Sequence, residues 1–403
     1  MVFICLGFCS SNKGRYLGPI TAALGIKRSL FSINDTFRFG ISALVNLFFG
    51  ALVAKFGVRK LVAFGFTCLI SSVLIYANAT HIAVFYIGGS LLGVGLAFTT
   101  TAVASILVKR WFTGNTGTIL GIVLAANGLG GAVAAQIVGP IIDKHAYGYR
   151  DAYNLVAVIL AVVGVLAVLL LRDAPKDHDG ELIVKNKKKA RGAGWVGVEF
   201  GKARKLSYFI PSLIGIFLTG MVLSGINGIG STHIKNDVGL AGSYVDNVMS
   251  IHSLVLLFSK MVAGVIYDKK GLRTVLTFCN GVGVVSMVSL AFVATTPVGL
   301  VLAMVWGITS SIALPMETIG VTLVASDLYG NKDFDKVLGI MLALNHAGYA
   351  VGSIVVNGLY DLCGGTYFYA MLLFAGLLLA VTIMYQFIIT AAHKVRKQVE
   401  AEV

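Results

Sequence analysis

Charged residues are scarce in this chain of 403 residues: only 12% are Asp, Glu, Lys or Arg, whereas 57% are hydrophobic. A water-soluble domain carries about a quarter charged residues, so the composition excludes an ordinary soluble fold. Proline is also rare, with 6 residues against 48 glycines. Few helix breakers and many small residues are typical of closely packed membrane helices. The sequence therefore predicts an all-α polytopic membrane protein.

Cysteine is too sparse and too scattered for a structural role in cross-linking. No two cysteines form a CxxC pair and none has a histidine at metal-ligand spacing, so we expect no disulfide framework and no metal site. A Walker lysine, HExxH and GxSxG are also missing, and no nucleophile–base pair stands out. We therefore expect no enzyme and no cofactor. The five cysteines are Cys5, Cys9, Cys68, Cys279 and Cys363.

Apolar runs of the length that a helix needs to cross hydrocarbon, about 20 residues, recur along the whole chain. They predict twelve transmembrane helices. The expected spans are 1–22, 30–55, 60–78, 82–108, 117–142, 152–171, 208–233, 243–267, 273–294, 297–325, 336–361 and 366–391.

Acidic residues are outnumbered, with 18 Asp and Glu against 32 Lys and Arg. If both termini are cytoplasmic, most of these cations lie on the cytoplasmic side of the membrane. The positive-inside rule therefore predicts that both termini are cytoplasmic. The protein would then lie in a cell membrane, which we take to be a bacterial inner membrane, and its net charge of +14 requires no nucleic acid.

The longest break between apolar runs divides six helices from six. We expect an N-terminal bundle (1–171), a basic cytoplasmic linker (172–207), a C-terminal bundle (208–391) and a cytoplasmic tail (392–403). The linker carries KNKKKARG. Such a segment either lies on anionic lipid or is simply a solvated charged loop.

The two halves repeat each other. GALVAKFGVRKLV (50–62) recurs as GVIYDKKGLRTVL (264–276), so that Gly50, Gly57 and Arg59 are matched 214 positions later by Gly264, Gly271 and Arg273. LGIVLAANGLGGAV (120–133) likewise matches LGIMLALNHAGYAV (338–351). Two homologous six-helix halves are an architecture of secondary transporters. We therefore predict two pseudo-symmetric six-helix bundles.

The loop between helices 2 and 3 (GALVAKFGVR, 50–59), echoed between helices 8 and 9 (GVIYDKKGLR, 264–273), resembles the G-x-L-x-D-x-x-G-x-R signature of the major facilitator superfamily. In that family the acid and the arginine form an ion-pair latch that stabilises the outward-open state. The resemblance implies such a latch at Asp268, whereas the first copy has Ala54 where the acid belongs. The implied latch residues are Gly50, Gly57, Arg59, Gly264, Asp268, Gly271 and Arg273.

Three further stretches resemble the monocarboxylate and oxalate/formate exchanger-like branch of the superfamily. They are LGPITAALGIKRSLFS (17–32), VKRWFTGNTGTILGI (108–122) and YGYRDAY (147–153). The branch carries small organic anions. Its helix-1 lysine meets the substrate carboxylate, which implies that role for Lys13 in SSNKGRY. The branch commonly has an arginine in helix 8, where this chain has His252.

Polar side chains inside apolar spans mark the candidate site, because a charge at bilayer depth usually faces a cavity or a partner. Arg38 and His252 occupy equivalent positions in the two halves and either contact substrate or pack structurally. The other substrate-binding candidates are Lys13, Asn127, Asn227, Asn345, His346 and Tyr349.

Two acids are candidates for ion coupling. Asp35 lies three residues before Arg38 on one helical face, where the two could also simply neutralise each other. Glu317 follows Pro315 and is either a proton-coupling group or a hydrogen-bonded stabiliser of a kink. Lys260 lies near the cytoplasmic end of its span, and we expect its side chain to extend to the membrane surface.

The residues and the resemblance together predict a monomeric secondary active transporter of a small organic anion such as a mono- or dicarboxylate. Alternating access would be driven by protons or by a counter-anion. Efflux of drugs or other hydrophobic solutes is the alternative, and a transport-inactive membrane sensor is a remote one. The solute, the coupling ion and the direction of transport are left open.

The repeat also predicts where the first helix begins. It maps the beginning of the seventh span, near Ser207 and Tyr208, to a point before Met1. The expectation is an upstream start, with a first helix held by its neighbours as the alternative.

Overall fold

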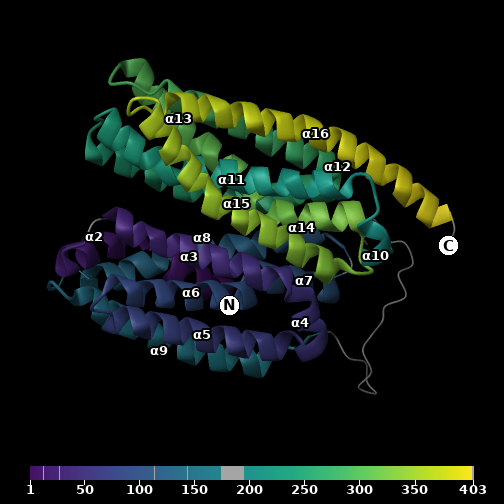
Figure 1. Cartoon of the computed structure of the whole chain (residues 1–403), viewed down its shortest axis with the longest axis horizontal. Coiled ribbons are helices and arrows are strands. Elements are labelled where there is room, and N and C mark those ends of the chain that lie inside the picture. Colours follow the sequence, from purple (N-terminus) through teal and green to yellow (C-terminus); the bar gives the residue numbers. More distant parts are fainter. Residues whose placement is uncertain (12, 27, 113, 143, 174–194, 402–403) are drawn as a thin grey trace. The chain divides into compact units, whose positions relative to one another are not determined.

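The structure is a computed structural model that describes residues 1–403 except 12, 27, 113, 143, 174–194 and 402–403. Its described part forms two compact units (Figure 1). Unit 1 comprises residues 1–114 and 122–191, and unit 2 comprises residues 115–121 and 192–403. Each unit is described by itself.

Unit 1 is built from helices joined by short turns. Its first apolar segment is interrupted by a π-helix, and a second segment bends where two helices meet. The elements are α1 (Val2–Leu6), η1 (Gly7–Ser11), α2 (Lys13–Leu24), α3 (Arg28–Leu47), α4 (Phe49–Phe56), α5 (Val58–Asn78), α6 (Ile82–Thr99), α7 (Thr101–Trp111), α8 (Thr116–Ile142, whose first residues fall in unit 2) and α9 (Gly148–Leu170).

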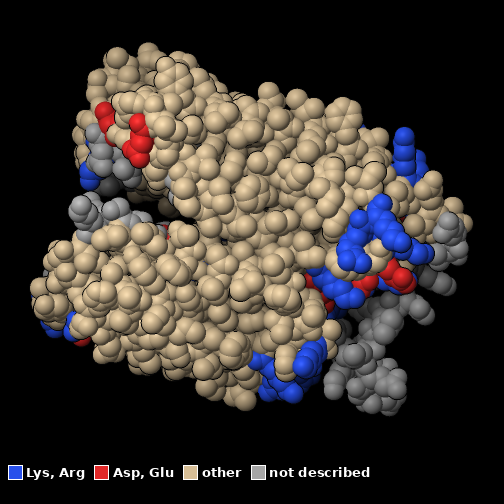
Figure 2. Space-filling model, viewed as in Figure 1, with Lys and Arg blue, Asp and Glu red and all other residues tan. Residues whose placement is uncertain are grey.

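Unit 2 contains the longer helices. Its elements are α10 (Phe200–Ala203), α11 (Phe209–Thr232), the π-helix η2 (His233–Asp237), α12 (Gly242–Ala291), α13 (Pro297–Ala313), α14 (Pro315–Tyr329), α15 (Phe334–Leu362) and α16 (Phe368–Ala401). On the face seen in Figure 2, the long sides of both units carry few charged side chains, as lipid contact requires.

The helices agree with the predicted spans. Nine helices of the described residues can each cross a bilayer, and the bent pair Ile33–Leu47 with Phe49–Phe56 makes a tenth. Helix α12 has 50 residues, about 75 Å, which is more than twice the hydrocarbon thickness of about 30 Å. It therefore contains two spans, and the segment from α1 to α2 completes the predicted twelve.

The predicted boundaries differ from the observed ones at two places. Residues 195–207 of the expected linker pack within unit 2, where α10 and the segment before it contact the end of α14. The expected tail continues α16 as far as Ala401. Residues 174–194 of the expected linker lie outside the described residues.

Helices α11 and α15 approach each other through glycine. A Cβ atom added to Gly348 would meet the backbone oxygen of Phe217, and one added to Gly352 would meet that of Met221. A Cβ on Gly220 would in turn lie 2.6 Å from the backbone oxygen of Asn345. Small residues allow such backbone contact, which drives helix association in lipid through van der Waals packing.

The repeated glycines break the helices where the sequence predicts a turn. Gly57 separates α4 from α5 with φ of 76°, and Gly271 interrupts α12 with φ of 83° and ψ of 176°. This region of backbone space is essentially restricted to glycine. Gly271 is therefore the hinge that converts the long helix α12 into two spans.

Replacing Gly271 by alanine is expected to lower the free energy of unfolding by about 1–3 kcal/mol, because a Cβ atom is strained at this φ and ψ. Thermal unfolding of the purified protein in detergent would measure the loss. Gly281→Ala is the matched control: this glycine lies in the same helix with open space around it and no positive φ. An equal loss in both variants would show that the hinge conformation is not the cause.

Candidate functional site

The first polar cluster of unit 1 is centred on Arg38 of α3. Its side chain is only 6% exposed. The guanidinium Nη1 donates a hydrogen bond to Ser10 Oγ at 3.1 Å, and Nη2 lies 3.7 Å from a carboxylate oxygen of Asp35. The third nitrogen, Nε, is buried without an acceptor among the described residues. Arg38 thus keeps an unused donor in a buried setting.

The π-helix η1 supplies the other side of this cluster. Ser10 and Ser11 end η1, and Ser11 Oγ donates to Asn127 Oδ1 of α8 at 2.8 Å. A π-helix inside an α-helical span often occurs at functional sites. We call Ser10, Ser11, Asp35, Arg38 and Asn127 the Arg38 cluster. It joins two predicted binding residues and the predicted coupling acid Asp35 with two serines that the sequence analysis missed.

Two predicted residues cannot be placed at side-chain level. Lys13 is the first residue of α2 and Asn227 lies within α11. Their side chains lie outside the described part of the structure.

His252, the counterpart of Arg38, makes different contacts. Its ring is buried, and Nδ1 lies 3.0 Å from Ser310 Oγ and 3.1 Å from the carbonyl oxygen of Gly307 on α13. The ring also stacks on Trp306 at 6.0 Å between centroids. Two hydrogen-bond partners without charge and the ring of Trp306 thus hold His252 against α13.

A second polar group of unit 2 surrounds the break between α13 and α14. Glu317 lies in the first turn of α14, and Tyr349 of α15 donates from its hydroxyl to the backbone oxygen of Glu317 at 2.7 Å. Lys260 of α12 is only 5% exposed, and its charge acts on Glu317. The expectation that Lys260 extends to the membrane surface is therefore wrong in this structure, because its side chain is buried in unit 2.

The two neighbouring polar residues of α15 contact different partners. Asn345 is 1% exposed and its amide nitrogen reaches the backbone oxygen of Ile216 on α11 at 3.5 Å. His346 lies beside Tyr349, with 5.4 Å between ring centroids. Three of the predicted residues (Asn345, His346 and Tyr349) thus lie on the face where α15 meets α11 and α14.

Asp268 of the latch sequence binds a helix start. Its two carboxylate oxygens accept hydrogen bonds from the backbone N–H groups of Gly117 (3.0 Å) and Thr118 (2.7 Å), at the beginning of α8 within unit 2. Arg273 instead donates to Thr390 Oγ1 at 2.7 Å. Among the described residues the two do not pair, so the contact differs from the ion pair that the resemblance implies.

A carboxylate also caps a helix start in unit 1. Asp173, which follows α9, accepts hydrogen bonds from the backbone N–H groups of Val58 (3.0 Å) and Arg59 (3.1 Å). The first turn of α5 is thus capped by a carboxylate from a distant part of the chain. Arg59 also donates from Nε to the backbone oxygen of Val168.

We expect Asp268→Asn to slow transport several-fold while leaving membrane insertion unchanged. An uncharged amide loses the charge-assisted bonds to the helix start, whose free energy is about 0.5–2 kcal/mol. Initial uptake rates in proteoliposomes, normalised to the inserted protein, would measure the change. Asp361→Asn, an exposed carboxylate at the end of α15, is the control. Unchanged turnover for Asp268→Asn would contradict a latch at this residue.

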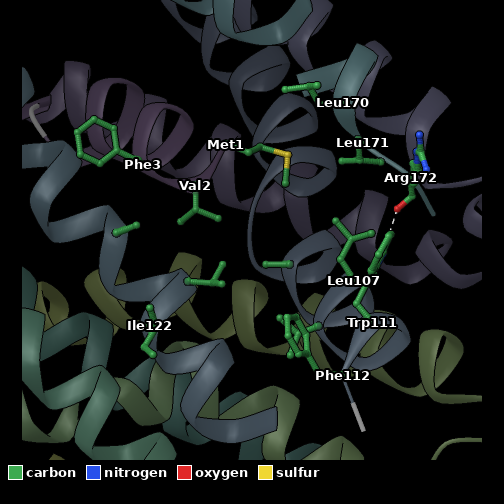
Figure 3. Close-up of a pocket in the computed structure, with 14 residues that line it drawn as sticks. Met1, Val2, Phe3, Leu107, Trp111, Phe112, Ile122, Leu170, Leu171 and Arg172 are labelled. Carbon is green, nitrogen blue, oxygen red and sulfur yellow. Dashed lines mark hydrogen bonds between the residues drawn. The ribbon is translucent and has the colours of Figure 1, made fainter. Parts of the chain in front are cut away.

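Unit 1 also contains an apolar cavity of about 640 Å³ (Figure 3). Met1 and Val2 line it from one side, Leu107 and Trp111 of α7 from another, and Ile122 of α8 from a third. Arg172 is the only charged side chain of the lining, and its backbone oxygen accepts a hydrogen bond from Trp111 Nε1 at 3.1 Å. None of the predicted site residues lines this cavity.

The described residues contain no group of three His, Cys, Asp or Glu side chains that could hold a metal ion. Within that part of the chain all five cysteines are free thiols.

Comparison with known proteins identifies the family. The family model for the Major Facilitator Superfamily matches residues 2–319 and 212–402. The chain is 25% identical over 265 residues to an uncharacterized MFS-type transporter, YcxA, of Bacillus subtilis strain 168, covering 65% of this chain and 61% of that relative. This chain therefore spans less than two thirds of YcxA. It is also 25% identical over 356 residues to multidrug resistance protein 2 of the same organism, covering 85% of this chain and 82% of that protein.

Solved structures show the same fold. The fucose:proton symporter of E. coli superposes with a TM-score of 0.71 at 14% identity, over 96% of both chains. The human organic anion transporter MFSD10 superposes with a TM-score of 0.64 at 13% identity, over 93% of this chain and 89% of that one. With the family match over most of the sequence and twelve apolar spans in the structure, the chain belongs to the major facilitator superfamily of solute transporters.

Proposed function

We propose that this protein is a secondary active transporter of a small organic anion, such as a mono- or dicarboxylate, that works by alternating access. The Arg38 cluster carries the proposal. A buried guanidinium with an unused N–H, the Ser10 hydroxyl and the Asn127 amide nitrogen present donors that a carboxylate accepts. The fold is shared with a protein named an organic anion transporter.

The charges of the Arg38 cluster favour binding of one anionic group of the solute. Asp35 lies at 3.7 Å from Arg38, longer than a direct hydrogen bond. A carboxylate that approaches Arg38 would compete with Asp35 for the same guanidinium. Arg38 would therefore exchange one partner for another rather than become an unpaired buried charge, which would be costly.

For coupling we propose a proton at Glu317 or exchange with a second anion. A carboxyl group that shares a buried region with Lys260 and Tyr349 can gain or lose a proton as the local charge changes. The fold neighbour from E. coli is named a proton symporter. We further propose a monomer with both termini in the cytoplasm of a bacterial cell.

Uptake into proteoliposomes tests the proposal directly. The purified chain would be reconstituted and offered a panel of labelled mono- and dicarboxylates, with and without a pH gradient and with and without internal anion. Saturable uptake of one or more carboxylates is expected, and either the gradient or the internal anion should increase it. Failure of every carboxylate in both modes would contradict the assignment.

Efflux of hydrophobic solutes is a second candidate function, and the apolar cavity of unit 1 favours it. Its lining is almost entirely aliphatic and aromatic, and one relative is named a multidrug resistance protein. In the same proteoliposomes, transport of a lipophilic dye without transport of carboxylates would support this candidate. Leu107→Trp, which partly fills the cavity, should then reduce dye transport.

A further inference from the structure

The segment before α10 is fastened to the loop that follows α14. Gly197 and Gly330 form an antiparallel bridge, in which Val198 N–H donates to the backbone oxygen of Tyr329 at 3.0 Å and Asn331 N–H donates to that of Val196 at 3.2 Å. Both glycines have positive φ, 92° and 76°. A Cβ atom on either would meet the backbone of the other strand. We call residues 195–199 the strap.

Side chains fix the strap at both of its ends. Trp195 is 4% exposed and its Nε1 donates to the backbone oxygen of Asp327 at 3.1 Å. At the other end Glu199 pairs with Lys332 at 2.7 Å. Asp333 accepts a hydrogen bond from the backbone N–H of Phe200 at 2.8 Å. That bond, with a second one from Lys336, holds the pKa of Asp333 below its usual value.

Helix α10 and the turn at residues 204 and 205 follow the strap, and together they have a buried side and an exposed side. Ala203 is fully buried in unit 2, whereas Lys202, Arg204 and Lys205 are exposed. These three cations, which we call the α10 cations, form no ion pair with any described residue, in contrast to Lys332 and Lys336. Figure 2 shows basic side chains gathered at this end of unit 2.

The α10 cations lie at the depth of lipid headgroups. Span α11 begins at Phe209, four residues after Lys205, so the cation lies within about 6–13 Å of the start of the span, whether the chain between them is helical or extended. The headgroup layer on each side of the hydrocarbon is about 5–8 Å thick. Phosphate groups of the bilayer are therefore within reach of these side chains.

We propose that the α10 cations form a docking surface for anionic phospholipid headgroups, which the strap holds in position. Three exposed cations that form no ion pair with any described residue complement a layer of phosphates, and each contributes about fivefold to binding of an anionic membrane surface. Arg204 lies over the Phe200 ring at 5.3 Å, a contact that leaves its charge unpaired. The strap matters because it fixes the start of α10, so that the three charges lie together at one depth. The surface would select anionic over zwitterionic lipid.

Lipid titration of the full-length protein tests the proposal. Native mass spectrometry from detergent would follow binding of phosphatidylglycerol, with phosphatidylethanolamine as the zwitterionic comparison. The double variant Lys202→Gln/Lys205→Gln is expected to need on the order of 20-fold more phosphatidylglycerol for half-saturation, because two charges are lost. The matched control Lys144→Gln/Lys235→Gln removes two exposed lysines from other helix ends and should leave that value within about twofold.

A second pair of variants tests the strap with all charges kept. Gly197→Ala is expected to weaken phosphatidylglycerol binding several-fold, since the bridge to Gly330 cannot form, whereas Gly201→Ala, which has open space around it, should not. An unchanged titration for the double lysine variant would overturn the docking surface. A loss in that variant but none in Gly197→Ala would overturn the role of the strap.

Discussion

Replacing Arg38 by glutamine is expected to weaken transport of the anionic substrate by about 10- to 100-fold in kcat/KM. Hydrogen bonds to a charged group contribute about 1.5–3 kcal/mol each, and glutamine supplies neither the charge nor the geometry of the guanidinium. The variant would also leave Asp35 in a partly buried position without its neighbouring cation. Initial rates of labelled carboxylate uptake over a range of concentrations would measure the loss.

The double variant Arg38→Gln/Asp35→Asn separates two roles of the arginine. If Arg38 only neutralises Asp35, removing both charges should restore most of the uptake. If Arg38 binds the substrate carboxylate, the double variant should remain as inactive as the single one. Restored uptake would therefore exclude Arg38 from the substrate site, and equal loss would support the proposed function.

Replacing Glu317 by glutamine is expected to abolish uphill accumulation driven by a pH gradient while solute exchange continues. An amide at this position cannot bind or release a proton, although it preserves the size of the side chain. A gradient of one pH unit can sustain about a tenfold solute gradient per coupled proton. The accumulation ratio of the variant should therefore fall from about tenfold to about one.

This variant has two controls. One measures solute exchange by the variant itself, and the other replaces an acid far from Glu317. Counterflow of labelled against unlabelled solute should proceed in Glu317→Gln, which shows that binding and access are intact. Glu400→Gln, near the exposed end of α16, should accumulate solute like the unchanged protein. Accumulation that persists in Glu317→Gln would remove Glu317 from the coupling mechanism and leave it as a stabiliser of the break at Pro315.

The spans could be predicted from the sequence because the bilayer fixes their length. Hydrophobic runs predicted nine of the spans to within a few residues, from α5 (Val58–Asn78) to α15 (Phe334–Leu362). The turn at Gly271 was also expected, because its match with Gly57 marked both as special backbone positions. These features depend on the local composition of the chain, which the sequence displays directly.

The site was predicted less completely because its contacts join residues that are far apart in sequence. Ser10 and Ser11 reach Arg38 and Asn127 only because η1 is a π-helix, a conformation that no local pattern indicated. Asp173 caps the start of α5 from 115 positions beyond Val58. The repeat matched His252 with Arg38, but the neighbours of His252, Trp306 and Ser310, lie on another helix.

The narrower resemblance to the monocarboxylate and oxalate/formate branch stays a prediction. It depends on short stretches of sequence, and the relatives and fold neighbours include proteins named for drugs, fucose and organic anions. Substrate choice is set by a few side chains within a shared fold. Only a transport assay can therefore decide the solute.

The glycine contact between α11 and α15 has a consequence for how such a protein can change over evolutionary time. Gly348 and Gly352 fix the spacing of the two backbones, and substitutions there are expected to be eliminated by selection. Asn345, His346 and Tyr349 are interspersed with these glycines on the same helix but do not set that spacing. These polar side chains can therefore be exchanged one at a time while the glycine spacing is preserved, and if they bind the solute as predicted, new substrate preferences would arise in this way.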